Sequence, residues 1–229
     1  RSAGKREVVD VCRTSMGVTQ PMSVIPHGVD PETYRPAPPD PTLRQELGLR
    51  GTVIGFIGRM MHMKGVESLI RAYAHTTEAY PDTTLLLLGA GPDRQFFEDV
   101  ATSLGIRERV LFKDFVPVAE VVRYINLMDM MVLPSLTVPD WKEQLGRVLL
   151  EAMACEVPII GSSSGEIPHV IADTGLVFPE GNVQALADAL TRYLRSPEER
   201  RRFALAGKQR VLDEYTNQQV ARKMYEMYQ

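Results

Sequence analysis

Short apolar runs rich in Val, Ile and Leu alternate along this chain with stretches of helical spacing, and this alternation constrains the fold more than any other feature. The runs are continuously apolar, as in strands buried on both faces of a sheet. Strands joined to helices by a few residues are typical of a parallel sheet covered by helices. The sequence therefore predicts an α/β fold with a Rossmann-like, doubly wound parallel sheet. The predicted strands are residues 22–25, 52–57, 84–88, 110–112, 130–133, 157–160 and 176–178.

The stretches between these strands have apolar residues at helical intervals. Such patterns predict helices over residues 66–73, 94–104 and 118–127. The Pro-rich segment 31–41 is interpreted as a surface connection that leads into a short helix at 43–47. From Asn182 onward the pattern predicts a wholly helical tail, in three segments: 183–194, 197–214 and 218–228.

Composition excludes several function classes. The 229 residues carry 26 basic and 29 acidic side chains, and a net charge of -3 gives no field that would hold nucleic acid or an anionic membrane. Cys12 and Cys155 have neither the number nor the spacing of a disulfide framework or a zinc site. No apolar run approaches a membrane span, and the charged opening residues are unlike a signal peptide. These features favour a cytoplasmic protein without a metal site, a nucleic-acid partner or a strong membrane signal.

A candidate anion site follows the predicted strand 52–57. Gly58 at the strand end lets a ligand approach the backbone, and a helix is predicted to begin near Gly65, where free N–H groups favour an anion. Arg59 and Lys64 add two full charges, which would suit a pyrophosphate. Two solvated loop cations are the alternative, and the spacing alone does not exclude it.

Two glutamates, Glu143 and Glu151, lie eight positions apart at and inside a predicted helix. Eight helical residues rise about 12 Å, so the two carboxylates cannot share a proton or a metal ion. They can accept hydrogen bonds from hydroxyls at opposite ends of an elongated ligand. Glu151 has apolar neighbours on several sides and therefore needs a partner, although two surface glutamates are the alternative reading. The Gly/Ser loop 161–165 is a weaker candidate for a second anion cradle.

In this order, these pieces resemble the C-terminal, donor-binding domain of retaining group 1 (family 4) glycosyltransferases, which have the GT-B fold. The resemblance covers nearly the whole chain. It rests on VIPHGVD (24–30), IGRMMHMKG (57–65), LLLLGAGPD (85–93), the long segment from EQLGRVLLEAMA to GEIPHVI (143–171) and TGLVFPEGN (174–182). Leu145 stands where an aromatic is frequent in that family, and Glu156 replaces the usual glycine.

The resemblance implies roles for individual residues. Arg59 and Lys64 would bind the diphosphate leaving group, Glu143 would contact sugar hydroxyls and Glu151 would hold the ribose. Arg59, Lys64 and Glu143 would be the catalytic set. The resemblance implies no metal, because the two cations would neutralise the diphosphate, and no cofactor; the nucleotide-diphosphate sugar is the donor substrate. The implied donor-binding residues are Gly58, Arg59, Lys64, Phe115, Val116, Glu143, Leu145, Gly146 and Glu151.

The resemblance also implies an organisation in which the N-terminal acceptor domain is missing. Residues 1–20 would be a linker helix from that domain, 21–215 the nucleotide-sugar-binding domain, and 216–229 a helix that returns to the missing partner. The isolated chain would then be inactive or weakly active, with an exposed apolar patch on its last helix.

Two alternatives to sugar transfer stay open. They are nucleotide-sugar binding without turnover, and a sugar-nucleotide epimerase of the same fold, which would need acid/base carboxylates and a histidine near the sugar. Trp141, the single tryptophan, is interpreted as a partly buried loop anchor, with stacking on a sugar as its alternative.

Overall fold

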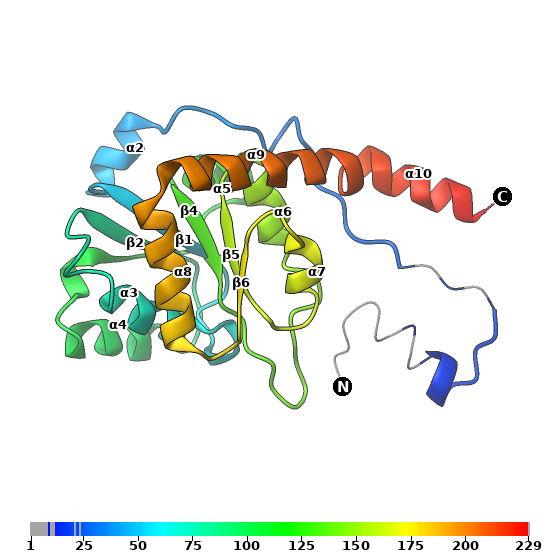
Figure 1. Ribbon diagram of the computed structural model, residues 1–229, viewed down its shortest axis with the longest axis horizontal. Coiled ribbons are helices and arrows are strands. Elements are labelled where there is room, and N and C mark those ends of the chain that lie inside the picture. The colour runs from blue at the N-terminus through cyan, green and yellow to red at the C-terminus, as the bar shows by residue number, and fades with distance from the viewer. Residues whose placement is uncertain (1–8, 10–11, 21, 23, 229) are drawn as a thin grey trace.

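A six-stranded parallel sheet forms the centre of the computed structural model, which describes residue 9, residues 12–20, residue 22 and residues 24–228 (Figure 1). The strand order is β3-β2-β1-β4-β5-β6, so strands are added on one side of β1 as far as β3 and on its other side from β4 onward, and the strand order reverses between β1 and β4. In open sheets of this kind ligands bind at that reversal, outside the carboxyl ends of the strands. The strands are β1 (Thr52–Ile57), β2 (Thr83–Leu88), β3 (Val110–Lys113), β4 (Met130–Leu133), β5 (Ile159–Ser162) and β6 (Leu176–Phe178).

Helices cover the sheet, as the alternating sequence pattern predicts. Helix α3 packs against α4 and α8, whereas α6 packs against α5 and α9. In Figure 1, α8 lies in front of the strands and α9 runs on towards α10, which projects away from the sheet. The helices are α2 (Pro41–Glu46), α3 (Val66–Ala74), α4 (Arg94–Ser103), α5 (Val118–Ile125), α6 (Arg147–Ala154), α7 (Ile167–Ile171), α8 (Val183–Arg195), α9 (Pro197–Glu214) and α10 (Asn217–Met227), with 3-10 turns η1 (His62–Lys64) and η2 (Arg107–Arg109).

The core explains why the strands have continuous apolar runs. Every residue of β2 and of β4 is buried, because helices cover both faces of the sheet. Tyr73 of α3 is also fully buried and donates its hydroxyl hydrogen bond to the carbonyl of Thr83, at the start of β2. The predicted α/β fold class is confirmed.

The predicted strand at 22–25 is wrong. The described residues of that segment, Met22, Val24 and Ile25, are irregular. Val24 lies by Glu166 and Tyr215, beside α7 and the end of α9, so it has no neighbouring strand with which to pair. The chain first pairs at Val29, which forms a single bridge to Thr216.

The start of one strand also differs from the sequence prediction. The strand expected at 157–160 begins at Ile159, because Val157 closes the turn after α6 through a hydrogen bond to Ala152. Half of the predicted linker helix, residues 1–20, lies outside the described residues. Residues 12–15 are helical and residues 16–20 are not, and the role of the segment as a linker stays a prediction. No helix in the described part of the chain is both long and apolar enough to cross a membrane.

Candidate functional site

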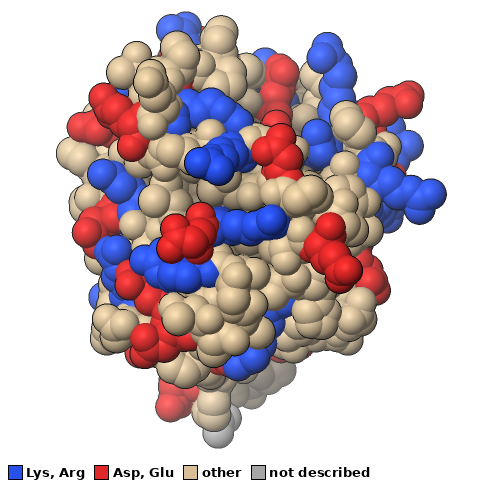
Figure 2. Space-filling view, turned by 90° about the vertical axis from the view of Figure 1, so that its left-hand side faces the viewer, with Lys and Arg blue, Asp and Glu red and all other residues tan. Residues whose placement is uncertain are grey.

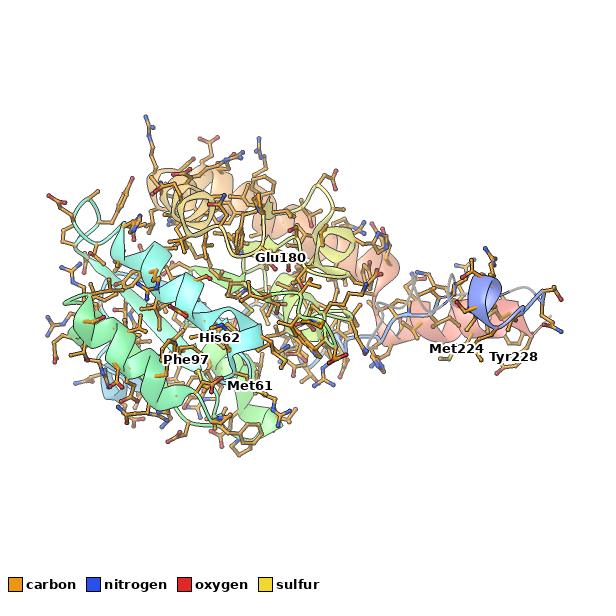
Figure 3. The ribbon with its side chains drawn as sticks, turned by 90° about the horizontal axis from the view of Figure 1, so that it is seen from below. Met61, His62, Phe97, Glu180, Met224 and Tyr228 are labelled. Carbon is orange, nitrogen blue, oxygen red and sulfur yellow. The ribbon has the colours of Figure 1, made fainter. Side chains whose placement is uncertain are left out.

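Three loops meet at the carboxyl ends of the central strands, beside the reversal in strand order. The loop after β1 is tied to the loop after β4, because the amide of Leu136 donates to the carbonyl of Met63. The loop after β5 is tied to the same region, because the amide of Glu166 donates to the carbonyl of Glu143 at 3.0 Å. Figure 3 views this region, with Met61 and His62 before α3 and Glu180 across from them.

Two glycines permit this close approach. Gly65, at the start of α3, has a φ of 69°, and a Cβ there would lie 1.8 Å from the carbonyl oxygen of Pro134. Gly165 has a φ of 54°, and its Cβ would lie 1.9 Å from the carbonyl oxygen of Glu143. A side chain at either position would push the loops apart.

Lys64 and Glu143 form an ion pair at the centre of these loops. The ammonium of Lys64 lies 2.8 Å from Oε2 of Glu143, and the two side chains are only 19% and 11% exposed. The hydroxyl of Ser135 donates to the same oxygen at 2.9 Å. Both bonds end on Oε2, and no described residue bonds Oε1, so that oxygen is available to a ligand.

Glu143 is not helical, which corrects the sequence prediction that placed it at the start of a helix. Gly146 has a φ of 67° and caps α6, which begins at Arg147. A left-handed residue ends the preceding loop, so Glu143 is free to turn towards Lys64 instead of following the helix.

A hydrogen-bonded network that the sequence did not reveal supports this ion pair. The hydroxyl of Ser162 donates a hydrogen bond to the carbonyl of Ser135. The hydroxyls of Thr137 and Ser164 form a hydrogen bond with each other, 3.0 Å long. Glu180 accepts from the amide of Thr137 at 2.6 Å. Ser162 and Ser164 belong to the Gly/Ser segment that the sequence offered as a second anion cradle, but both are buried and bonded to protein groups. Only the fold brings these five residues together.

Arg59 lies on the other side of the β1 loop, at the rim of an apolar pocket of about 460 Å³. Its side chain is exposed and has no ion-pair partner among the described residues. Phe115 is 72% exposed at this pocket, whereas Val116 is buried. The pocket therefore brings together four predicted site residues. Its lining is Ile57, Gly58, Arg59, Leu88, Gly89, Ala90, Phe115, Val116 and Val121.

Glu151 lies within α6 and is 7% exposed. Burial raises the pKa of its carboxyl group, and the charge of Arg147 together with hydrogen bonds from Arg147 and Tyr34 opposes that rise. The Arg147 Nε to Glu151 Oε1 distance is 3.0 Å. Burial, reinforced by the neighbouring charge of Glu151, raises the pKa of Tyr34 to about 12. Glu143 and Glu151 thus have separate partners, as expected for carboxylates that serve different groups.

The remaining predicted site residues are Leu145 and Gly146, and both pack against other parts of the protein. The Leu145 side chain is buried and lines a small separate pocket with Glu166 and His169. A Cβ on Gly146 would lie 2.8 Å from the side chain of Leu133. The described residues contain no cluster of three or more His, Cys, Asp or Glu side chains arranged to hold a metal ion, and metal independence stays a prediction.

A larger pocket, of about 650 Å³, lies at the opposite edge of the sheet, where β2 and β3 begin. Its lining includes Arg50, Arg107 and Arg109 together with Asp82 and Glu108. Figure 2 shows the side of the molecule that carries α2, where basic and acidic side chains are interspersed. The pocket beside Arg59 and Phe115 is the better candidate for the ligand site, because ligands of open α/β sheets bind at the carboxyl ends of the strands.

Comparisons with known proteins identify the family of the chain. The family described as glycosyl transferases group 1 matches residues 40–210. A GDP-mannose-dependent phosphatidylinositol monomannoside mannosyltransferase from Mycolicibacterium smegmatis is 30% identical, over 88% of this chain and 54% of its own length. A 2-deoxystreptamine glucosyltransferase from Streptomyces kanamyceticus is also 30% identical, over 90% of this chain and 54% of its own length. The chain thus spans about half the length of these curated relatives.

Solved structures share the fold. The C-terminal domain of the group 1 protein LpcC from Francisella tularensis superposes with a TM-score of 0.73 at 27% identity, covering 83% of this chain and 100% of that domain. Anabaena HepE, solved with UDP-glucose, gives a TM-score of 0.83 at 25% identity, covering 98% of this chain and 63% of HepE. From its sequence and its fold, the chain belongs to the glycosyl transferases group 1 family.

Proposed function

We propose that this chain is the donor-binding half of a retaining glycosyltransferase, which transfers a sugar from a nucleotide-diphosphate sugar to an acceptor. One observation carries the proposal: an apolar pocket, an arginine with no ion-pair partner among the described residues, and a largely buried lysine–glutamate pair follow one another along the carboxyl edge of the sheet. A nucleotide sugar has the same order of chemistry, with a flat base, a diphosphate and a polyhydroxylated ring. Relatives named for GDP-mannose use and a neighbour solved with UDP-glucose support it.

Each part of the donor has a matching group. The apolar pocket, with Phe115 and Val116 at its wall, would take the base, and Glu151 would accept hydrogen bonds from the ribose hydroxyls. Arg59 and Lys64 would bind the diphosphate, and Oε1 of Glu143 would accept a hydrogen bond from a sugar hydroxyl. Leu145 and Gly146 would then act by shaping the loop that carries Glu143.

Charge stabilisation would be the chain's main contribution to catalysis. As the bond between the sugar and the diphosphate breaks, negative charge grows on the leaving group, and two fixed cations stabilise it without a metal. Removal of one such donor costs on the order of 3 kcal/mol in the transition state. Same-face attack would retain the anomeric configuration, with the donor phosphate taking the acceptor proton, so Glu143 need not be a nucleophile.

The acceptor site and part of the catalytic apparatus would lie in the other half of the longer relatives. The transfer reading is favoured over an epimerase, because the eight-residue spacing of Glu143 and Glu151 resembles the glutamate motif of the transferases and the matching family is one of glycosyl transferases. Binding without turnover is what the isolated chain would show.

Calorimetric titration of the chain with UDP, GDP and ADP, without added metal, tests the proposal. One nucleoside diphosphate should bind with a clear preference, and Arg59→Ala should weaken it at least tenfold. Arg71→Ala, which removes an arginine paired with Glu67 on α3, is the matched control and should bind as wild type does. Failure of the folded chain to bind any of the three at millimolar concentration would sink the proposal.

A further inference from the structure

Trp141 lies directly over the ammonium group of Lys64. The distance from Nζ of Lys64 to the centroid of the indole ring is 4.5 Å, within the range of a cation–π interaction. The same ammonium lies 2.8 Å from Glu143, so it is held between an aromatic face and a carboxylate. Tryptophan is the strongest of the aromatic side chains in this interaction.

The loop that carries Trp141 is fixed at several points. Val138 and Trp141 exchange two backbone hydrogen bonds, of 2.8 and 3.0 Å, in a tight antiparallel bridge. One residue earlier, Thr137 bonds both Glu180 and Ser164, which join the loop to the segments after β6 and β5. The backbone of Trp141 is therefore held in place independently of Lys64.

We infer that Trp141 is a positioning residue for Lys64, which presents the ammonium to the diphosphate of the donor; this inference rests on the proposed function. An ammonium has three N–H donors, and Glu143 takes one of them. The ring limits the flexible four-carbon stem to one arrangement, so a free N–H faces the ligand before it arrives. A side chain that is already ordered loses less entropy on binding.

This role exceeds that of a loop anchor, because it predicts dependence on the charge of Lys64. Trp141→Leu should weaken binding of the preferred nucleoside diphosphate about fivefold or more, the size expected for a partly buried cation–π contact. Trp141→Phe keeps an aromatic face and should restore most of the affinity. In a Lys64→Met background, Trp141→Leu should have no further effect, because the two changes act through one contact.

Two controls separate positioning from damage to the loop. Phe96→Leu removes another half-exposed aromatic, which contacts His62 and Phe97 rather than Lys64, and should bind nucleotide as wild type does. Circular dichroism and urea midpoints should show that all variants are folded. Equal losses from Trp141→Leu with and without Lys64 would overturn the inference in favour of a purely structural role.

A donor-free measurement keeps this inference separate from the proposed function. Trp141 is the single tryptophan, so tryptophan fluorescence reports on the surroundings of this one indole ring, which include the ammonium of Lys64. Lys64→Met should change the emission of the ligand-free chain, whereas Lys208→Met, which removes a lysine paired with Glu156, should not. If the emission does not respond to Lys64, the inference fails even when nucleotides bind. If the emission responds to Lys64→Met but no nucleotide binds, the contact between Trp141 and Lys64 is present without a role in nucleotide binding. The positioning role then fails together with the proposed function.

Discussion

At the scale of single residues, Glu151 shows a conflict between folding and ligand binding. Burial raises its pKa above the ordinary value of 4.5, so the fold disfavours the charged form that would accept hydrogen bonds from ribose. The Glu151 carboxyl group therefore holds its proton more tightly in the folded chain than in the unfolded chain. The contribution of Glu151 to stability therefore falls as the pH rises through the raised pKa, and it is least favourable at neutral pH.

Glu151→Gln should consequently stabilise the fold at pH 7 while weakening nucleotide binding. The advantage in urea midpoint over wild type should shrink as the pH is lowered towards 4.5, where the wild-type carboxyl is increasingly protonated. Glu78→Gln, at an exposed position, is the control and should match wild type at both pH values. A Glu151→Gln variant that is less stable than wild type at pH 7 would contradict this account.

Glu156 adopts a left-handed backbone conformation, with a φ of 56°, which explains why a glycine is usual at this position. Its side chain pairs with Lys208 at 2.7 Å. Glu156→Ala loses that pair and keeps the strained backbone, whereas Glu156→Gly loses the pair and relieves the strain. We expect the glycine variant to be more stable than the alanine variant by about 1 kcal/mol in denaturant unfolding. Equal stabilities would show that the backbone strain is negligible.

At the scale of elements, loop contacts at the carboxyl edge position the site. Gly165→Ala would force the loop after β5 away from the carbonyl of Glu143 and break its bond to Glu166. We expect a loss of about 2–4 kcal/mol in unfolding free energy and a large loss of nucleotide affinity. Gly48→Ala, at a φ of 62° with no atom within 4 Å of a built Cβ, reports the left-handed strain alone, about 1 kcal/mol. Equal costs at the two positions would show that the close approach is unimportant.

The elements themselves were largely predictable from the sequence. Continuous apolar runs identified all six strands of the sheet, because the central strands are buried on both faces, and the edge strands β3 and β6, which are partly exposed, are also apolar. The run at 22–25 was misread, since a run of apolar residues does not reveal whether a neighbouring strand is present. The prediction that the helix includes Glu143 was also wrong, because Gly146 caps the N-terminus of α6, which begins only at Arg147.

The site was predictable only in part. The strand end and the predicted helix start singled out Arg59 and Lys64, and the spacing to Glu151 singled out Glu143. The structure brings Lys64 and Glu143 together, and the roles of the three residues stay predictions. The supporting contacts of Ser135 and Trp141 depend on loop conformations that have no sequence periodicity. Whether Leu145 and Gly146 touch a donor stays a prediction.

At the scale of the whole molecule, α10 exposes an apolar surface, as the sequence analysis expected. Met224, Tyr225, Met227 and Tyr228 are 46%, 65%, 49% and 86% exposed, and Figure 3 shows Met224 and Tyr228 well away from the sheet. Such a surface favours association. Sedimentation velocity should show self-association that a Tyr225→Ser, Tyr228→Ser variant reduces, whereas Phe115→Ser, at another exposed aromatic, leaves it unchanged. Equal association of both variants would assign it to another surface.

The central claim is that the donor nucleotide binds at the carboxyl edge of the sheet, and hydrogen exchange with and without the preferred nucleoside diphosphate tests it most directly. We predict slower amide exchange on nucleotide addition in residues 58–65, 115–117, 135–146 and 163–167, with no change in residues 78–83 and 104–110 around the larger pocket at the opposite edge. Protection confined to residues 78–83 and 104–110 would place the nucleotide at the opposite edge and contradict the account.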